Sequence, residues 1–161
     1  MWTGLAAVKS WKDLEKALIK ARDKALESTG EKTKELVKDR IDRDVYSVAS
    51  PSIYERTYEL RESVQPSKVS SKGNTAELEI GHDTSLIGSY SPNQHYSVVD
   101  GSSSVDYIAE IVHDGKSGKI FGEGFWTQKR PYMDNAKEEM KDGKYKKFMI
   151  EELKKQGLNA K

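Results

Sequence analysis

The residues of this chain best suited to chemistry are its three histidines, and their spacing does not form a local site. They are His82, His95 and His113, and two of them occur in the pairs His82-Asp83 and His113-Asp114. A metal site needs two or more convergent ligands, and neither pair has the spacing of a known ligand motif. The pattern favours histidines at a surface or an interface. We expect no metal and no cofactor.

Other arrangements that would indicate an enzyme are also missing from the sequence. The glycine-containing stretch 115–124 does not end in the Lys-Ser/Thr pair of a phosphate-binding loop, so flexibility explains its glycines better. No Gly-x-Ser-x-Gly element presents a nucleophilic serine, and there is no cysteine. An enzyme that uses His113 with Asp114 or Glu110 therefore ranks last among the hypotheses. We expect a protein that is not an enzyme.

Composition predicts a folded chain with a small core and a polar surface. The 161 residues are 35% hydrophobic and 33% charged, against about 45–50% and about 25% in typical domains. A net charge of +1 is too small to keep the chain unfolded by self-repulsion, and it gives no general reason to expect nucleic-acid binding. Without cysteine there are no disulfides, and no apolar stretch reaches the roughly 20 residues of a membrane helix. The N-terminus does not resemble a signal peptide, so we expect a soluble intracellular protein.

The N-terminal quarter of the chain has the pattern of an amphipathic helix from Ser10 to about Arg43. Ser10 suits the N-cap, and Gly30 is expected to end a first helix, with a second from about Glu31 to Arg43. One helical face is apolar and has spacings of three and four: Trp11, Leu14, Leu18, Ala21 and Ala25. This repeat fades after Ala25, which argues against a coiled coil.

The middle of the chain predicts short strands. Alternation is clearest over 76–80, and the preceding Ser71-Lys72-Gly73-Asn74 is typical of a hairpin turn. Residues 45–48 are predicted as a strand, 54–61 as a turn of helix and 64–70 as extended apart from Pro66. The acidic face of the clearest strand indicates an antiparallel sheet with one packed face.

The C-terminal half alternates polar loops with helices. Residues 84–105 and 115–124 predict long loops, and helices are expected at 105–113, from Pro131 to about Lys141, and at 144–156. The predicted fold class is α+β, with a long N-terminal helix, an antiparallel β-sheet packed on helices, and long polar loops. We expect a single domain over residues 1–161, with residues 1–9 and 157–161 flexible.

Two side-chain clusters have alternative interpretations. The aromatic residues in and directly after the second loop either cover the core or bind a partner; they are Phe121, Phe125 and Trp126. The C-terminal lysine cluster either contacts nucleic acid or forms a solvated helix face together with nearby glutamates; it comprises Lys141, Lys144, Lys146 and Lys147. Residues 129–161 carry ten Lys/Arg and six Asp/Glu, an excess of four, and the solvated face is the better explanation.

Three separated elements resemble the head–tail joining and tail-completion proteins of long-tailed phages. Residues 57–64 match Thr-Gly-x-Leu-Arg-x-Ser-Ile through Thr57, Leu60, Arg61 and Ser63, with Tyr58 in place of the glycine. Residues 108–116 match Tyr-Ala-x-x-Val-Glu-x-Gly-Thr through Ala109, Val112 and Gly115, and depart from it at Ile108, His113 and Lys116. The third element, Arg-Pro-Phe-Leu with a following alanine, is matched by Arg130, Pro131, Tyr132, Met133 and Ala136.

The resemblance covers roughly residues 10–145 and implies a structural protein. It implies a neck or minor capsid protein of a phage or prophage, which forms a homo-oligomeric ring at the head–tail junction or tail end and joins head to tail. Its partners would be the head connector or completion protein and the tail tube or tail terminator protein, with no membrane and no specific nucleic acid. Its location would be the virion, and the host cytoplasm during assembly. The alternative is a small intracellular nucleic-acid-binding or adaptor protein that uses the C-terminal lysine cluster.

Overall fold

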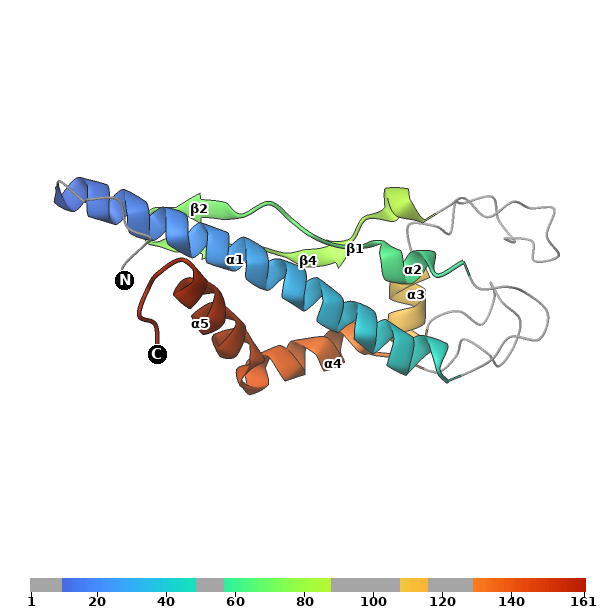
Figure 1. Ribbon diagram of the computed structural model, residues 1–161. Coiled ribbons are helices and arrows are strands. Elements are labelled where there is room, and N and C mark those ends of the chain that lie inside the picture. The colour runs from blue at the N-terminus through green and yellow to red at the C-terminus, as the bar shows by residue number, and fades with distance from the viewer. Residues whose placement is uncertain (1–9, 49–56, 88–107, 116–128) are drawn as a thin grey trace. The chain divides into compact units, whose positions relative to one another are not determined.

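The protein has an α+β fold with a long N-terminal helix, a small antiparallel sheet and C-terminal helices, which confirms the predicted fold class. The computed structural model describes residues 10–48, 57–87, 108–115 and 129–161 (Figure 1). Most of the two predicted loops, and with them His95, Phe121, Phe125 and Trp126, lie outside the described residues. The chain forms two compact units: unit 1 is residues 1–35, 66–81 and 138–161, and unit 2 is residues 36–65 and 82–137. The single domain over 1–161 stays a prediction, since the units interleave along the chain.

Helix α1 (Trp11–Ile41) runs unbroken through Gly30, so the prediction of two helices was wrong. The reason is a close approach within unit 1. A Cβ atom added at Gly30 would lie 2.8 and 2.9 Å from the two methyl carbons of Leu78. Glycine in a helix interior is unfavourable by about 1 kcal/mol, and here it leaves the space that the leucine side chain fills.

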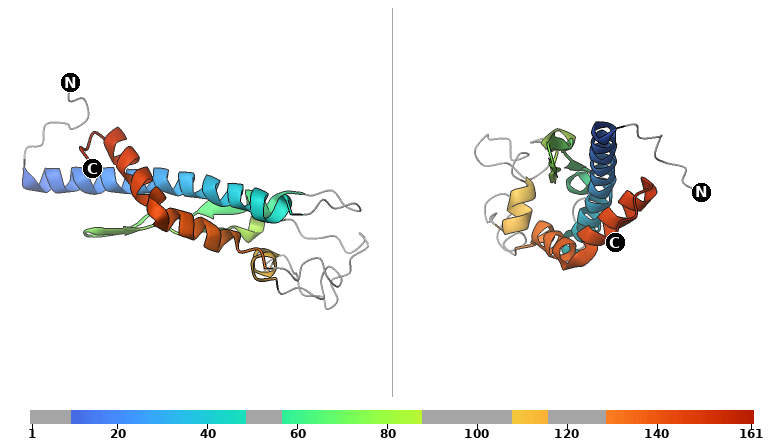
Figure 2. Two further views of the ribbon diagram at one scale, coloured as in Figure 1. Left: turned by 90° about the horizontal axis from the view of Figure 1, so that it is seen from below. Right: turned by 90° about the vertical axis from the view of Figure 1, so that its left-hand side faces the viewer.

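Unit 1 places a β-hairpin and a C-terminal helix beside the middle of α1. Strands β2 (Ser70–Lys72) and β3 (Thr75–Glu77) pair antiparallel, which confirms the predicted hairpin turn. The Arg22 guanidinium donates to Ser71 Oγ and to the Gly73 carbonyl oxygen, at 2.6 and 3.1 Å. Helix α5 (Tyr145–Lys155) follows the π-helix η4 (Met140–Lys144), and Figures 1 and 2 show α5 alongside α1.

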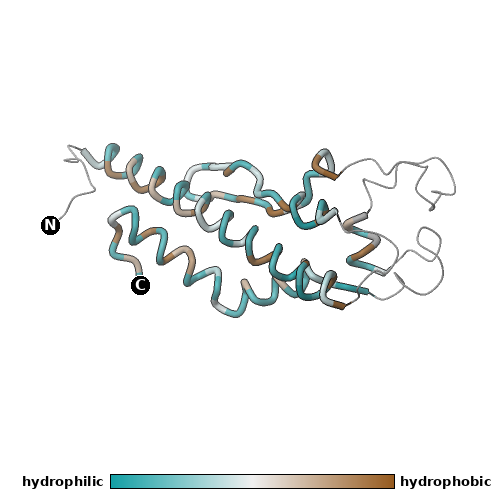
Figure 3. The backbone as a smooth tube through the Cα atoms, turned by 45° about the vertical axis from the view of Figure 1, so that its right-hand side comes forward, coloured by the Kyte–Doolittle hydropathy of each residue, from teal (hydrophilic) through white to brown (hydrophobic). Residues whose placement is uncertain are grey.

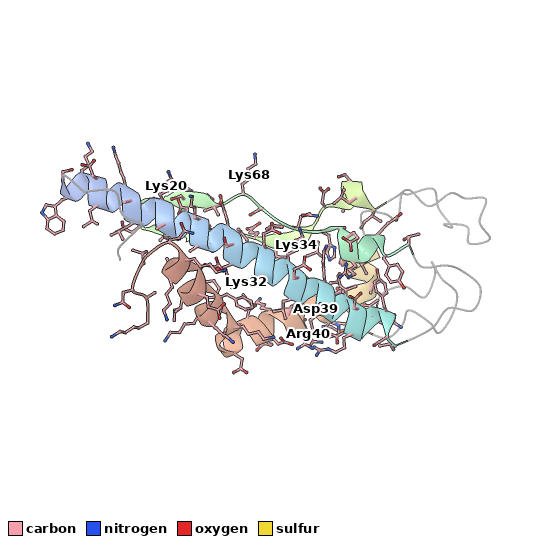
Figure 4. All side chains as sticks on the ribbon, viewed as in Figure 1. Lys20, Lys32, Lys34, Asp39, Arg40 and Lys68 are labelled. Carbon is pink, nitrogen blue, oxygen red and sulfur yellow. The ribbon has the colours of Figure 1, made fainter. Side chains whose placement is uncertain are left out.

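Many of the contacts between α1 and α5 in unit 1 are polar. Figure 3 shows that hydrophilic residues dominate both helices. Lys32 points toward α5 (Figure 4), and its Nζ lies 2.8 Å from Glu151 and 2.9 Å from Glu152. The same ammonium group lies over the Phe148 ring, 5.1 Å from its centroid. Hydrogen bonds to the two glutamates raise the pKa of Lys32. The bond from Lys32 lowers the pKa of Glu151, and the bonds from Lys155 and then Lys32 lower the pKa of Glu152.

The strand predicted at 45–48 is wrong, because α1 continues into the π-helix η1 (Asp42–Tyr46). Val45 is 1% exposed and lies in the core of unit 2. A short apolar run fits either a buried strand or a buried helical segment, and its period does not separate the two. The short helix expected within 54–61 is α2, which spans Glu59–Glu62.

The continuous strand predicted at 76–80 is divided into two. Strand β3 ends at Glu77, and β4 (Ile80–His82) pairs instead with β1 (Val64–Pro66). Ser67 marks the change of partner, since its N–H donates to the Glu79 carbonyl and its hydroxyl accepts from the Glu79 N–H. The 3₁₀ helix η2 (Thr84–Leu86) follows, and the Asp83 carboxylate caps it.

Unit 2 holds most of the buried apolar side chains. The predicted helices near 108 and 131 are α3 (Ile108–Asp114) and α4 (Tyr132–Glu139). Among the described residues of unit 2, the buried apolar side chains are Val37, Ile41, Val45, Leu60, Val64, Ile87, Val112, Tyr132 and Ala136. In the described part of unit 1 only Ala25 and Leu26 reach this degree of burial. Unit 2 is therefore the place to look for a precisely positioned site.

Candidate functional site

A chain of hydrogen bonds crosses the core of unit 2 and links the ends of α2, β4 and α4. Ser63 Oγ lies 2.8 Å from His82 Nδ1, and His82 Nε2 lies 2.9 Å from the Tyr132 hydroxyl. Ser63 is 0% exposed and Tyr132 is 1% exposed. Both ring nitrogens of His82 are thus bonded inside the unit. We name these three residues the polar cluster.

The hydrogen bonds of the polar cluster can run in either of two directions, which differ in which atom donates and which accepts at each contact. In the first, Ser63 donates to the Leu60 carbonyl (2.9 Å), His82 Nδ1–H donates to Ser63, and Tyr132 donates to His82 Nε2. In the second, all three protons reverse and Tyr132 donates to the Ala109 carbonyl at 3.3 Å. The shorter contact to Leu60 favours the first direction. Each direction requires a neutral imidazole, because a protonated ring has no acceptor nitrogen.

The surroundings keep the polar cluster neutral. Burial, and after it the nearby His113, lowers the pKa of His82 to about 4. Burial likewise raises the pKa of the Tyr132 phenol. The His82 and His113 rings both meet the Tyr132 ring edge to face, at centroid distances of 5.8 and 5.5 Å. The polar cluster is therefore uncharged near neutral pH and links α2, β4 and α4 through hydrogen bonds.

His113 and its neighbours connect α3 to the beginning of α4. The Arg130 N–H donates to the His113 carbonyl at 3.1 Å. On the ring, Nδ1 lies 2.9 Å from an Asp114 carboxylate oxygen, and Nε2 lies 3.6 Å from Asp134, too far for a hydrogen bond. The bond from the Arg130 N–H therefore joins the last turn of α3 to the segment that leads into α4.

Ion pairs connect α2 to neighbouring residues of unit 2. Arg61 donates to Asp42 at 2.9 Å and also pairs with Glu62. Lys38 is 7% exposed, and its Nζ lies 2.8 Å from Glu62. The hydrogen bond from Lys38, supported by Arg61, lowers the pKa of Glu62, while the bond to Asp42 raises that of Arg61. These pairs hold α2 against the end of α1.

Two positions of the phage-like elements have a left-handed backbone. Gly115, which follows α3, has φ +71°, as expected of a glycine at a helix C-terminus. Tyr58, at the N-cap of α2, has φ +58°, and it stands where the resembled element has glycine. A side chain in this region costs roughly 1–2 kcal/mol. The Tyr58 ring meets the Tyr46 ring edge to face at 5.0 Å, which offsets part of that cost.

Comparison with known proteins identifies the family of the chain. The family model of YomN matches residues 10–155 of the 161. The chain belongs to the YomN family. This family is phage-derived, so the chain is a phage-related protein. No curated protein and no solved structure matches the sequence.

The structure brings together residues from all three phage-like elements of this YomN-family chain. Ser63, Ala109, His113 and Tyr132 meet in or around the polar cluster. Leu60 and Val112 contribute to the apolar core, Arg61 makes the ion pairs at α2, and Arg130 and Pro131 immediately precede α4. Thr57 is exposed and lies apart from these contacts.

Sequence reasoning missed His82 as a member of this site. The expectation of a surface or interface histidine is wrong for it, since both ring nitrogens bond inside unit 2. A usable signal was present: His82 lies two residues from Ile80 on the same strand, so the period of two places both on one face. Tyr46 was also missed, because it was assigned to a strand.

The described residues were also searched for metal-binding groups and for membrane-spanning helices. Within those ranges, no three His, Asp or Glu side chains group closely enough to hold a metal ion. Nor is any helix there both long enough and apolar enough to span a membrane.

Proposed function

We propose that this YomN-family chain is a structural protein of a tailed-phage particle that forms a ring at the head–tail junction or tail end and joins head to tail. Its partners would be the head connector or completion protein on one side and the tail tube or terminator protein on the other. Its location would be the virion neck or tail. The phage-derived family supports the general class, and the resemblance of the three elements supports the specific role.

The observation that carries this proposal is the convergence of the three elements on the polar cluster. That convergence brings together residues that lie near the ends of the second predicted polar loop and after the first. Ile87 lies five residues after the end of β4, the Ala109 carbonyl lies 3.3 Å from the Tyr132 hydroxyl, and His113 and Arg130 are joined through their backbones. A ring subunit needs firm anchor points for the segments that reach its neighbours, and this core supplies them.

The burial of the polar cluster supports a role without catalysis. A serine hydroxyl beside a histidine can form a nucleophile and base, and Ser63 and His82 have the required 2.8 Å distance. A nucleophile must also meet its substrate, and Ser63 is 0% exposed. In the favoured direction its proton is donated to the Leu60 carbonyl, away from the histidine.

The pairing of basic residues supports joining over the nucleic-acid-binding alternative. Lys141 lies 2.8 Å from Glu138, and Lys144 pairs with Glu139, so two members of the C-terminal lysine cluster have carboxylate partners. A carboxylate beside each lysine reduces the number of phosphates that the cluster can neutralise. Lys146 and Lys147 are exposed and provide a smaller basic surface.

The test is electron microscopy of phage particles whose own copy of this gene is deleted and is supplied in trans. With the intact chain we expect tailed particles. With a variant that lacks residues 117–124 we expect free heads and free tails, because this predicted loop would carry contacts to the neighbours. The matched control, Lys146→Ala/Lys147→Ala, changes an exposed surface of unit 1 and should restore tailed particles.

Thermal unfolding of the purified loop variant separates a binding role from a folding role. We expect a melting temperature close to that of the intact chain, since 116–128 connects two anchored ends. Tailed particles with the loop variant would refute the role of the loop. Tailed particles in the complete absence of the chain would refute the proposed function.

A further inference from the structure

Helix α5 is held in unit 1 without a buried apolar side chain. Of its eleven residues only Glu152 is buried, with 4% of its surface exposed. Its apolar side chains are half-buried, apart from Tyr145, which is 48% exposed; the half-buried ones belong to Phe148, Met149, Ile150 and Leu153. Apolar burial is the main favourable contribution to folding, and an element with little of it opens at a lower free-energy cost than the core does. Helix α5 is therefore held less firmly than the core of unit 2.

The contacts between α5 and α1 converge on one charged group. We name the α1–α5 contact the side chains of Thr29, Lys32, Phe148, Met149, Glu151 and Glu152. The Lys32 ammonium lies 2.8 Å from Glu151 and 2.9 Å from Glu152, and it lies 5.1 Å from the centroid of the phenylalanine ring. The Thr29 hydroxyl donates to the Met149 sulfur at 3.2 Å, and a thioether sulfur is a weak acceptor. Loss of the Lys32 charge therefore removes two ion pairs and the ring contact together.

Two features lower the cost of opening this contact. The Glu152 carboxylate also lies 2.7 Å from Lys155 of its own helix, so it keeps a cation when Lys32 is withdrawn. The Lys32 and Glu151 side chains are 30% and 43% exposed, so water already reaches both. Salt screens ion pairs that solvent reaches, since the Debye length falls from about 10 Å at 0.1 M to about 3 Å at 1 M. Ionic strength is therefore the variable that weakens the α1–α5 contact.

The segment that leads into α5 provides a pivot. Within η4, Asp142 has φ −72° and ψ 31°, and Gly143 has φ +93°, so the helical backbone is interrupted there. A Cβ atom added at Gly143 would meet nothing within 4 Å beyond its chain neighbours, and no residue of η4 is buried. Glycine adopts positive and negative φ about equally readily, and hinges are commonly a few residues at the ends of elements. The backbone at Gly143 is therefore free to change the direction in which α5 leaves η4.

We infer that α5 is a releasable helix: it leaves α1 as one element by rotation at Gly143, and salt favours its release. In the closed state Thr29 is 2% exposed, and release of α5 uncovers it. The two states therefore differ in the accessibility of this face of α1 as well as in the helical order of α5. The inference concerns contacts within unit 1 of one chain, so it does not depend on the proposed ring.

The β-hairpin of unit 1 stays on α1 when α5 leaves, because it has contacts of its own. Arg22 donates to Ser71 Oγ and to the Gly73 carbonyl. The Leu78 side chain fills the space at Gly30. None of these contacts involves α5, so opening is confined to the C-terminal helix.

Hydrogen–deuterium exchange of the purified full chain, read by peptide mass spectrometry at 0.1 and 1 M NaCl, tests the release. An isolated helix of eleven residues is marginal in water, so a released α5 loses its helical hydrogen bonds and exchanges its amide hydrogens. We expect residues 145–155 to exchange faster than residues 22–34, and about threefold faster at 1 M than at 0.1 M NaCl. Residues 22–34 should show no such acceleration, because α1 remains folded.

The variant Lys32→Gln removes the charge at the centre of the α1–α5 contact. In this variant we expect residues 145–155 to exchange about tenfold faster at 0.1 M NaCl and to lose most of the salt dependence. The matched control Lys20→Gln removes the same charge from an exposed position of α1 and should exchange like the intact chain. Equal exchange of 145–155 in Lys32→Gln and in the intact chain would overturn the inference. Equal acceleration of residues 22–34 and 70–77 would also overturn it, since unit 1 would then open as a whole.

Thiol labelling of the variant Thr29→Cys gives a second, independent measurement. The chain has no cysteine of its own, so the reagent reports on one position. We expect labelling to be faster at 1 M than at 0.1 M NaCl, and faster than that of Val45→Cys, whose position is 1% exposed in unit 2. Equal labelling rates for the two variants would refute the release of α5 alone. Tailed particles formed without the chain would refute the proposed function and leave this inference intact.

Discussion

The polar cluster predicts that the protein loses stability as the pH falls from about 6.5 toward 4. His82 is neutral in the folded state down to a pKa of about 4, whereas in the unfolded chain it binds a proton near 6.5. Within this window the unfolded state binds more protons, so the free energy of unfolding rises with pH. The contribution is complete above pH 6.5 and is lost as the pH falls toward 4.

The magnitude follows from the two pKa values. The difference between 6.5 and about 4 corresponds to at most about 3.4 kcal/mol. Solvent reaches part of the half-buried ring, so we expect about 2 kcal/mol. The paired carboxylates Glu62, Glu151 and Glu152 have lowered pKa values and lose their stabilisation only below about 4.5. The change in the free energy of unfolding between pH 6.5 and 4.5 therefore measures the titration of His82 rather than that of the paired carboxylates.

Urea unfolding at pH 7.5, 6.5, 5.5 and 4.5, followed by circular dichroism, measures this dependence. The variant His82→Gln has no titrating group at this position and should be less stable at pH 7.5, with a flatter profile between pH 6.5 and 4.5. The control His113→Gln changes the neighbouring ring but keeps the polar cluster. An equal slope in the intact chain and in His82→Gln would refute the reasoning.

Three further predictions concern backbone strain, close packing and charge. Tyr58→Gly should change the free energy of unfolding by less than about 0.5 kcal/mol, because relieved strain offsets the lost ring contact, whereas Tyr58→Ala should cost about 1 kcal/mol; urea unfolding compares them. Gly30→Ala should lower the melting temperature despite its better helix propensity, and Leu78→Ala in the same chain should recover part of the loss. Duplex DNA should bind weakly or not at all near physiological salt in a fluorescence anisotropy titration; sub-micromolar binding that is lost when Lys144, Lys146 and Lys147 become Glu would favour the adaptor alternative.

Sequence reasoning recovered the elements whose signals are local. The hairpin at Gly73, the C-terminal helix and the helix that follows Pro131 were predicted close to their observed bounds. Each depends on a turn residue or on periodicity within about ten positions. The α+β class followed from the order of these elements.

The errors arose where distant residues decide the local structure. Gly30 was expected to end a helix but lies inside α1. The side chain of Leu78, which is distant in the sequence, occupies the space that a larger residue at position 30 would fill. Val45 was assigned to a strand, and burial in unit 2 instead accommodates it in a π-helix. Tertiary packing outweighs local propensity at both sites.

The candidate site was only partly predictable. Ser63, Ala109, His113 and Tyr132 were singled out through a resemblance, and nothing in their spacing shows that they meet. His82, which joins Ser63 to Tyr132, belongs to none of the three elements and was assigned to the surface. Its strand alternation indicated which face it occupies, but the partners on that face come from three other segments of the chain.

The hydrogen bond from the Arg130 N–H to the His113 carbonyl joins two residues that lie 17 positions apart in the sequence. The entropy of closing a segment between two joined residues grows only with the logarithm of its length, by about 0.6 kcal/mol for each doubling. Insertions and replacements between Gly115 and Lys129 therefore leave the folded core nearly unaffected. In the proposed ring, replacing this stretch would change what it recognises without redesigning the core, and an epitope or fluorescent label inserted there would report on assembly.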